Sequence, residues 1–148
     1  MSSKLPSGDQ AKTYFYSFEQ LPRHTFTKHT TSNGAVVKGE KMYVGLVNKP
    51  RGSGSQPHRH PFEQFNYVLK GKLKAWVDGE EQVVPPGGLI HIPANTLHTI
   101  VATPEEDVIF FMIKEVTSLG TAGIPEDPNV TGPRFEPGFG PASLKSEK

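Results

Sequence analysis

The sequence predicts a single-domain, all-β protein. Its length of 148 residues suits one hydrophobic core. Short apolar or alternating segments follow one another between turns rich in Gly and Pro, at the close spacing typical of a sandwich or barrel. No segment with a convincing helical period interrupts them. We therefore expect consecutive β-strands packed around one core.

The first predicted strands lie in the middle of the chain. Residues 41–47 form one apolar run, which ends at the loop Pro-Arg-Gly-Ser-Gly over residues 50–54. Residues 65–69 form the next and end at Gly71. In residues 72–77 three aliphatic side chains alternate with two lysines and a tryptophan, which predicts a strand with one buried face.

The remaining strands follow strong turn signals. Asp78-Gly79 is a two-residue hairpin signal before a strand over residues 81–84, and the Pro-Pro-Gly-Gly sequence at 85–88 predicts another turn. Further strands are predicted over 89–92, 99–102 and 108–116. The last strand has two candidate inward faces, either Val108, Phe110 and Met112 or Ile109, Phe111 and Ile113.

The two ends differ in composition from the middle. Residues 1–12 are predicted to be a flexible leader, residues 13–117 the β-barrel domain, and residues 118–148 a C-terminal arm. Residues 120–148 contain five Gly and five Pro without apolar periodicity. The arm is therefore either a loose tail or a segment that wraps a partner subunit, with three apolar anchors: Ile124, Phe135 and Phe139.

Composition excludes several functional classes. Sixteen basic and 15 acidic residues almost cancel, which argues against nucleic acid and anionic membranes as partners. No apolar run is long enough to cross a bilayer and the first ten residues lack the apolar core of a signal peptide, so we expect a cytoplasmic protein. Without cysteine, any metal site must use nitrogen and oxygen ligands.

Four side chains have the spacing of a metal site. His58 and His60 are two residues apart, so on an extended chain both rings project to the same side. Gln64 follows four residues later, and Pro61 between them can bend the chain so that the amide oxygen returns to that side. His98 comes from a separate turn. Four such donors leave positions open for water or substrate.

These residues resemble the two sequence motifs of the cupin superfamily, across about residues 41–115. The resemblance implies a single-domain double-stranded β-helix, or jelly roll, with a metal deep in the barrel and a small-molecule substrate entering at one mouth. Gly52, His58, His60, Gln64 and Gly71 resemble the first motif, and Gly87, Pro93 and His98 the second.

The sequence departs from the cupin pattern at the position where glutamate is usual. Gln64 stands there, with Glu63 beside it as an alternative ligand, although the spacing to Gly71 favours Gln64 and Glu63 would face the opposite side of a strand. The chain thus resembles the cupins that bind metal through His, His, Gln and His, which include hydroxynitrile lyases and the cupins that open unsaturated uronates. Asn95 replaces a usual glycine and tolerates its left-handed conformation, and Ala102 replaces a usual asparagine.

The neutral glutamine has a consequence for reactivity. Three imidazoles and an amide leave the full charge of a divalent ion uncancelled, which strengthens its Lewis acidity and disfavours the trivalent state. The cofactor is expected to be one divalent transition metal, Mn, Fe, Co, Ni or Zn. The leading hypothesis is a redox-neutral lyase or isomerase. The alternatives are a metal-dependent dioxygenase and a non-catalytic small-molecule or sugar-binding protein.

No general base is evident from the sequence. The stretch 108–112 lacks the carboxylate that the uronate-opening cupins carry there. His91, which shares strand parity with Leu89, is the candidate acid or base, and a half-exposed strand histidine is the alternative. His24 and His29 are expected at the surface.

The other conspicuous side chains are expected to be structural. Arg59 lies between two ligands and should face away from them, into an ion pair or a dimer contact. The apolar segment 14–18 is expected to form an edge strand that pairs with a second copy, which predicts a homodimer. Tyr43, Tyr67 and Trp76 either line the mouth of the barrel or pack in its core or interface.

Overall fold

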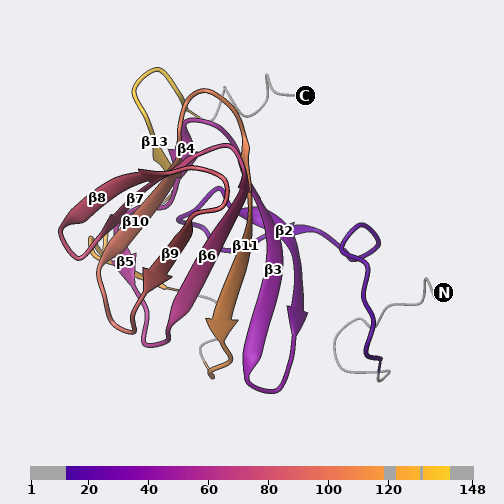
Figure 1. Cartoon of the computed structure of the whole chain (residues 1–148). Helices are drawn as coiled ribbons and strands as arrows, with labels where there is room; N and C mark the ends of the chain where they lie inside the picture. Colours follow the sequence, from indigo (N-terminus) through magenta and orange to yellow (C-terminus); the bar gives the residue numbers. More distant parts are fainter. Residues whose placement is uncertain (1–12, 119–122, 131, 141–148) are drawn as a thin grey trace.

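A computed structural model describes residues 13–118, 123–130 and 132–140, and it confirms the all-β prediction. The described residues contain two antiparallel sheets that face each other (Figure 1), and no helix with the length and hydropathy of a membrane span. The strands are β1 (His24–Thr25), β2 (Asn33–Lys38), β3 (Met42–Lys49), β4 (Ser53–Gly54), β5 (His58–Arg59), β6 (Gln64–Lys70), β7 (Leu73–Val77), β8 (Glu80–Val84), β9 (Leu89–Ile92), β10 (His98–Ala102), β11 (Val108–Glu115), β12 (Ile124–Pro125) and β13 (Arg134–Phe135).

The first sheet has six strands, in the order β1-β2-β3-β11-β6-β9. β11 lies at its centre, paired with β3 along its whole length and with β6 on the other side. The second sheet contains β12-β5-β10-β4-β13, with the β7–β8 hairpin joined to β10. This arrangement places β5 and β10, which carry two of the predicted ligands, side by side.

The core lies between the two sheets and settles which face of β11 points inward. Val108, Phe110 and Met112 are buried in it, whereas Ile109 and Phe111 are only half-buried on the outer face. The alternation continues to Lys114, which is also buried. The inner face of β11 therefore ends in a charged side chain.

Two turns have the backbone conformation that their sequences predict. Asp78 and Gly79 both have positive φ, of 48° and 89°, as the tight β7–β8 hairpin requires. Asn95 has a φ of 59°, so it adopts the left-handed conformation in place of a glycine. That substitution is structural, as expected.

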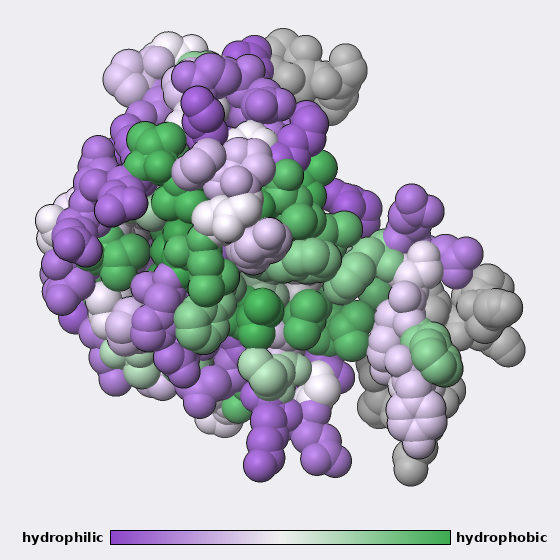
Figure 2. Space-filling model, in the orientation of Figure 1, coloured by the Kyte–Doolittle hydropathy of each residue, from purple (hydrophilic) through white to green (hydrophobic). Residues whose placement is uncertain are grey.

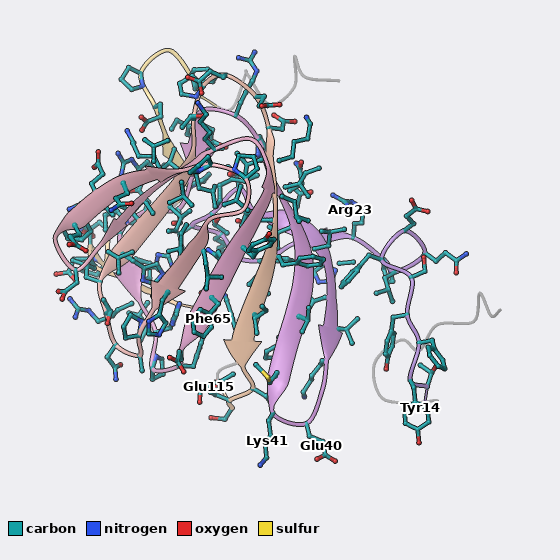
Figure 3. The ribbon with its side chains drawn as sticks, in the orientation of Figure 1. Tyr14, Arg23, Glu40, Lys41, Phe65 and Glu115 are labelled. Carbon is teal, nitrogen blue, oxygen red and sulfur yellow. The ribbon has the colours of Figure 1, made fainter. Side chains whose placement is uncertain are left out.

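The N-terminal part of the domain differs from the prediction. Residues 14–18 are not a strand but an irregular segment with a turn, and Tyr14 and Phe15 are 89% and 83% exposed. Figure 3 shows Tyr14 well away from the sheets. The expected edge strand is therefore wrong. The edge is formed instead by β1 and β2, which the sequence pattern did not predict.

The described parts of the C-terminal arm pair with the barrel of their own chain. β12 pairs with β5, and β13 pairs with β4. Lys74 Nζ lies 2.7 Å from Glu136 Oε1, and the Arg51 guanidinium lies 5.3 Å from the centre of the Phe139 ring. The described parts of the arm are thus not a loose tail, and contact of the arm with a partner subunit stays a prediction. The predicted leader over 1–12 lies outside the described residues.

Candidate metal centre

Three predicted ligands meet between β5 and β10. His58 and His98 are directly opposite each other in the antiparallel pair, and His60 follows two residues after His58. One nitrogen of each ring lies within 4.8 Å of the others, so the three can share one ion. His60 and His98 are almost fully buried and His58 is half-buried, which leaves the group accessible from one side only.

Each of the three histidines has its other ring nitrogen held by a backbone carbonyl. The Nδ1 atoms of His58, His60 and His98 each lie 2.8 Å from a carbonyl oxygen, of Gln56, Phe62 and Thr96 respectively. In neutral imidazoles these Nδ1–H groups donate, so Nε2 is the free acceptor in every ring. The His60 ring also stacks on Phe62, at 4.1 Å between centroids and 4° between planes. The rings are therefore oriented as ligands before an ion arrives.

Gln64 completes the group in a way that fits a cation. Its Oε1 lies 3.0 Å from His60 Nε2, while its amide nitrogen donates to Asn66 Oδ1 at 2.8 Å. Two acceptors therefore face each other, and such a contact needs a proton or a metal ion between them.

The lowered pKa values of the three histidines favour metal binding over protonation. Burial lowers the pKa of His58 to about 2 and that of His98 to about 4. Burial, and next the charge of Lys114, also lower the pKa of His60. All three rings are thus neutral at pH 7, which is the form that binds a metal. The donor set fits one divalent transition ion held by His58, His60, His98 and Gln64.

The ligands open into a small pocket with a positive character. Its volume is about 50 Å³, and besides three of the ligands it is lined by Lys49, Lys114 and His29. Lys49 and Lys114 are 2% and 8% exposed. Burial lowers their pKa values to about 7 and about 8, the charge of Lys114 also acting on Lys49. No Asp or Glu is among the described residues that line the pocket.

The prediction that His29 lies at the surface is wrong. His29 is 9% exposed, and its ring centroid lies 5.1 Å from that of His58. Burial, followed by Lys114, lowers the pKa of His29. A neutral imidazole therefore lies beside the ligand group, on the segment before β2 that showed no sequence pattern.

His91 lies on the outer side of the sheet, so the structure supports the alternative of a half-exposed strand histidine and not an acid or base in the pocket. On β9 the inward residues are Ile90 and Ile92, and His91 stacks on Phe65 with 4.6 Å between ring centroids. Its Nε2 lies 2.6 Å from Glu63 Oε2, and both side chains are 48% exposed. Glu63 consequently faces away from the histidine group, and it is Gln64 that lies beside it.

The remaining candidates lie outside the pocket. Arg59 forms the expected ion pair, with Nη2 3.0 Å from Glu126 Oε1, and thereby ties the arm to β5. None of Tyr43, Tyr67 and Trp76 lines the pocket, and Tyr67 is 39% exposed on the outer face of its sheet. His24 is exposed, as expected.

The C-terminal arm forms one wall of the pocket. Gly123 lines it immediately before β12, and a Cβ atom there would collide with Cδ2 of the His58 ring. The sequence pattern of the arm did not indicate this role. Lys49 and Lys114 were not predicted either, although strand parity with Val47 and Met112 indicates that both lysines point inward.

Comparisons with known proteins agree with this geometry. A family model described as a cupin domain matches residues 45–114. The chain is 40% identical over 52 residues to the quercetin 2,3-dioxygenase of Bacillus subtilis (strain 168), covering 34% of this chain and 15% of that protein. It is 30% identical over 76 residues to the dimethylsulfoniopropionate lyase DddW of Ruegeria pomeroyi, covering 51% of this chain and 50% of that protein. The chain thus spans half or less of either relative.

A solved structure supports the fold. The polyketide cyclase RemF from Streptomyces resistomycificus superposes with a TM-score of 0.66 at 18% sequence identity, covering 79% of this chain and 90% of that chain. At this identity the similarity concerns the arrangement of strands alone.

Proposed function

This chain belongs to the cupin superfamily, and from that membership we propose that it is a divalent-metal enzyme catalysing a redox-neutral lyase or isomerase step on a small, oxygen-rich substrate. Its two sheets form the jelly-roll barrel of the superfamily, with the histidine group inside. The observation that carries the proposal is the charge of the pocket: neutral ligands, two lysines, and no carboxylate among the described lining residues.

The positive charge of the pocket favours the divalent over the trivalent state of a bound ion. A ligand set without a carboxylate leaves the charge of a divalent ion uncancelled, and the nearby lysines add to the positive potential. Oxidation to the trivalent state would increase that repulsion. When bound, the ion supplies Lewis acidity toward a carbonyl or hydroxyl oxygen of the substrate.

The chain's own residues have distinct parts in this proposal. Backbone carbonyls hold His58, His60 and His98 so that each Nε2 points to the ligand group. Phe62, which is fully buried, stacks on His60 and excludes water from its outer face. His29 lines the pocket, whereas His91 does not. His29 is therefore the group that would hold or move a proton, at a ring nitrogen.

A second candidate function is oxygen-dependent cleavage. The observation that favours it is the 40% identity, over 52 residues, to a quercetin 2,3-dioxygenase. In that case the substrate would supply the negative charge that the ligands lack. A third candidate, a non-catalytic binding protein, needs no proton-transfer group at all.

Metal loading is the first test. The purified chain is stripped with a chelator and reloaded separately with Mn, Fe, Co, Ni and Zn, and elemental analysis should find one ion per chain. His98→Ala should lose the ion, whereas His24→Ala, which changes an exposed histidine, should keep it. A chain that takes up no metal would refute the proposed centre.

The reaction class is tested on the metal-loaded chain. Small hydroxy acids, sulfonium carboxylates and uronates are incubated with and without oxygen, and products and oxygen uptake are measured. We expect turnover that is independent of oxygen. Activity that disappears under anaerobic conditions would support the dioxygenase instead, and binding without turnover would support the non-catalytic candidate.

A further inference from the structure

Lys49 is a buried cation with neutral partners. It ends β3 on the inner face, and its Nζ donates to Ser32 Oγ at 2.7 Å and to Thr30 Oγ1 at 3.4 Å. The Phe110 ring lies below it, 5.9 Å from Nζ to the centroid. Among the described residues, no carboxylate forms an ion pair with Lys49. The pocket therefore contains a positive charge that no carboxylate of the described residues neutralises.

The surroundings make that charge unfavourable. Burial, and next the charge of Lys114, lower the pKa of Lys49 to about 7. Lys49 in turn acts on the metal site, since its charge contributes to the lowered pKa of His98. A buried cation is destabilising unless an opposite charge accompanies it. An anion that entered the pocket would relieve this repulsion for Lys49.

Ser32 provides a second group that suits an anion. Its Oγ accepts from both Lys49 Nζ and Thr30 Oγ1, at 2.7 and 3.2 Å, so its own proton is left to donate. Ser32 and Lys49 both line the pocket that contains His58, Gln64 and His98. A donor hydroxyl and an ammonium on the same wall form a pair of hydrogen-bond donors for a carboxylate.

We propose that this pocket selects small carboxylate substrates, whose anionic group is bound by the Lys49 ammonium and the Ser32 hydroxyl while the rest of the molecule faces the metal ligands. The inference deepens the proposed function and rests on it. The pocket volume of about 50 Å³ restricts the substrate to a short-chain acid, because a single water already requires about 10–15 Å³ of such space.

Pyruvate and its neutral isostere pyruvamide are suitable probes for the test. Both are titrated into the metal-loaded chain by calorimetry, together with Lys49→Met and the control Lys70→Met. Lys70 is a β6 lysine whose side chain is 60% exposed, so the control makes the same change of charge outside the pocket. Metal uptake by Lys49→Met shows that this variant is folded.

The wild-type chain should bind pyruvate about tenfold or more tightly than pyruvamide, since a charge-assisted hydrogen bond contributes at least that factor. Lys49→Met should lower the preference about tenfold, because the charge of the bound ion still favours the anion, and Lys70→Met should keep it in full. Equal affinity for the two probes, or an unchanged preference in Lys49→Met, would overturn the inference.

Metal binding is measured separately on the same samples. A chain that binds no metal refutes the proposed function, whereas a loaded chain without preference for pyruvate refutes only the carboxylate site. Since Lys49 is not in the ligand group, the metal-stripped chain should keep a weaker preference for pyruvate, and its absence there would also count against Lys49.

Discussion

At the scale of single residues, Gln64 is the position that distinguishes this centre from one with a glutamate ligand. Its amide oxygen lies 3.0 Å from His60 Nε2, and its amide nitrogen is held by Asn66. In this arrangement the amide nitrogen of Gln64 is bound to Asn66, which leaves the amide oxygen directed at the histidine group.

Gln64→Glu should make a bound ferrous ion easier to oxidise, because the added negative charge stabilises the ferric state. We expect the iron-loaded variant to oxidise in air about tenfold or more faster than the wild-type chain, measured by the appearance of the ferric signal in electron paramagnetic resonance. The matched control is Glu63→Gln, next to it on the outer face. Equal oxidation rates, or unchanged turnover in Gln64→Glu, would contradict the charge argument.

Lys49 should make the stability of the metal-stripped chain depend on pH. Its pKa is about 7 in the folded chain and 10.5 ordinarily, so between these values the unfolded chain binds more protons. The cost of burying Lys49 is complete below pH 7 and fades as the pH rises. The free energy of unfolding of the wild-type chain, relative to that of Lys49→Met, should rise by up to about 1.4 kcal/mol per pH unit above pH 7. Urea denaturation between pH 6 and 9.5 measures both free energies. If they change with pH in the same way in the wild-type chain and in Lys49→Met, the prediction is wrong.

At the scale of elements, the C-terminal arm lies against the candidate metal site. β12 pairs with β5, which carries His58, and Gly123 lies against the His58 ring. Only a residue without a Cβ atom fits there, because the ring occupies the space that the atom would need. The arm therefore helps to set the orientation of a ligand from outside the barrel sequence.

Gly123→Ala should displace the His58 ring and weaken metal binding about tenfold or more, as changes next to metal ligands commonly do. Competition with a chromophoric chelator gives the affinity. Gly132→Ala is the control in the same arm, because nothing lies within 4 Å of its added Cβ atom. If both variants bind metal as the wild-type chain does, the arm has no part in the centre.

The strands that could be predicted are those that carry their own signal. β7 and β8 alternate around an Asp-Gly turn, and β11 is a long apolar run. β4, β5, β12 and β13 have two residues each, so their conformation depends on the strand beside them. β2 has six residues but was not predicted, and its outer edge pairs with the two-residue β1. A strand with its own alternating or apolar pattern can be predicted from the sequence, whereas a strand without one forms because it pairs with its neighbours.

At the scale of the whole molecule, the outer face of the six-stranded sheet is apolar. Figure 2 shows hydrophobic atoms gathered over β9, β6 and β11, and Figure 3 shows Phe65 on this side. Tyr67 pairs with both Leu89 and Phe111, and Phe18 covers part of the Phe111 ring at 6.2 Å. Leu69 and Leu89 remain 41% and 57% exposed. A patch of this kind suits a second copy of the chain.

We accordingly propose a homodimer that buries this face, although not through the edge strand expected from residues 14–18. Leu89→Lys should convert the dimer into a monomer, because the two-fold contact would bury the added charge twice. Light scattering coupled to size exclusion measures the mass. Val83→Lys, which changes an equally accessible side chain on β8 of the other sheet, should remain a dimer. A wild-type chain that is monomeric at all concentrations would refute the proposal.

The sequence by itself predicted the histidine group and the class of fold, and the structure has both. The two-residue spacing of His58 and His60 and the turn before His98 are local features, which a sequence displays directly. The tertiary structure decided what surrounds these ligands. Lys49, Lys114 and His29 reach the pocket only because β3, β11 and the segment before β2 meet there, and Gly123 only because the arm pairs with β5. Such contacts join residues far apart in the chain, so the register between strands, not the pattern within one, brings them together.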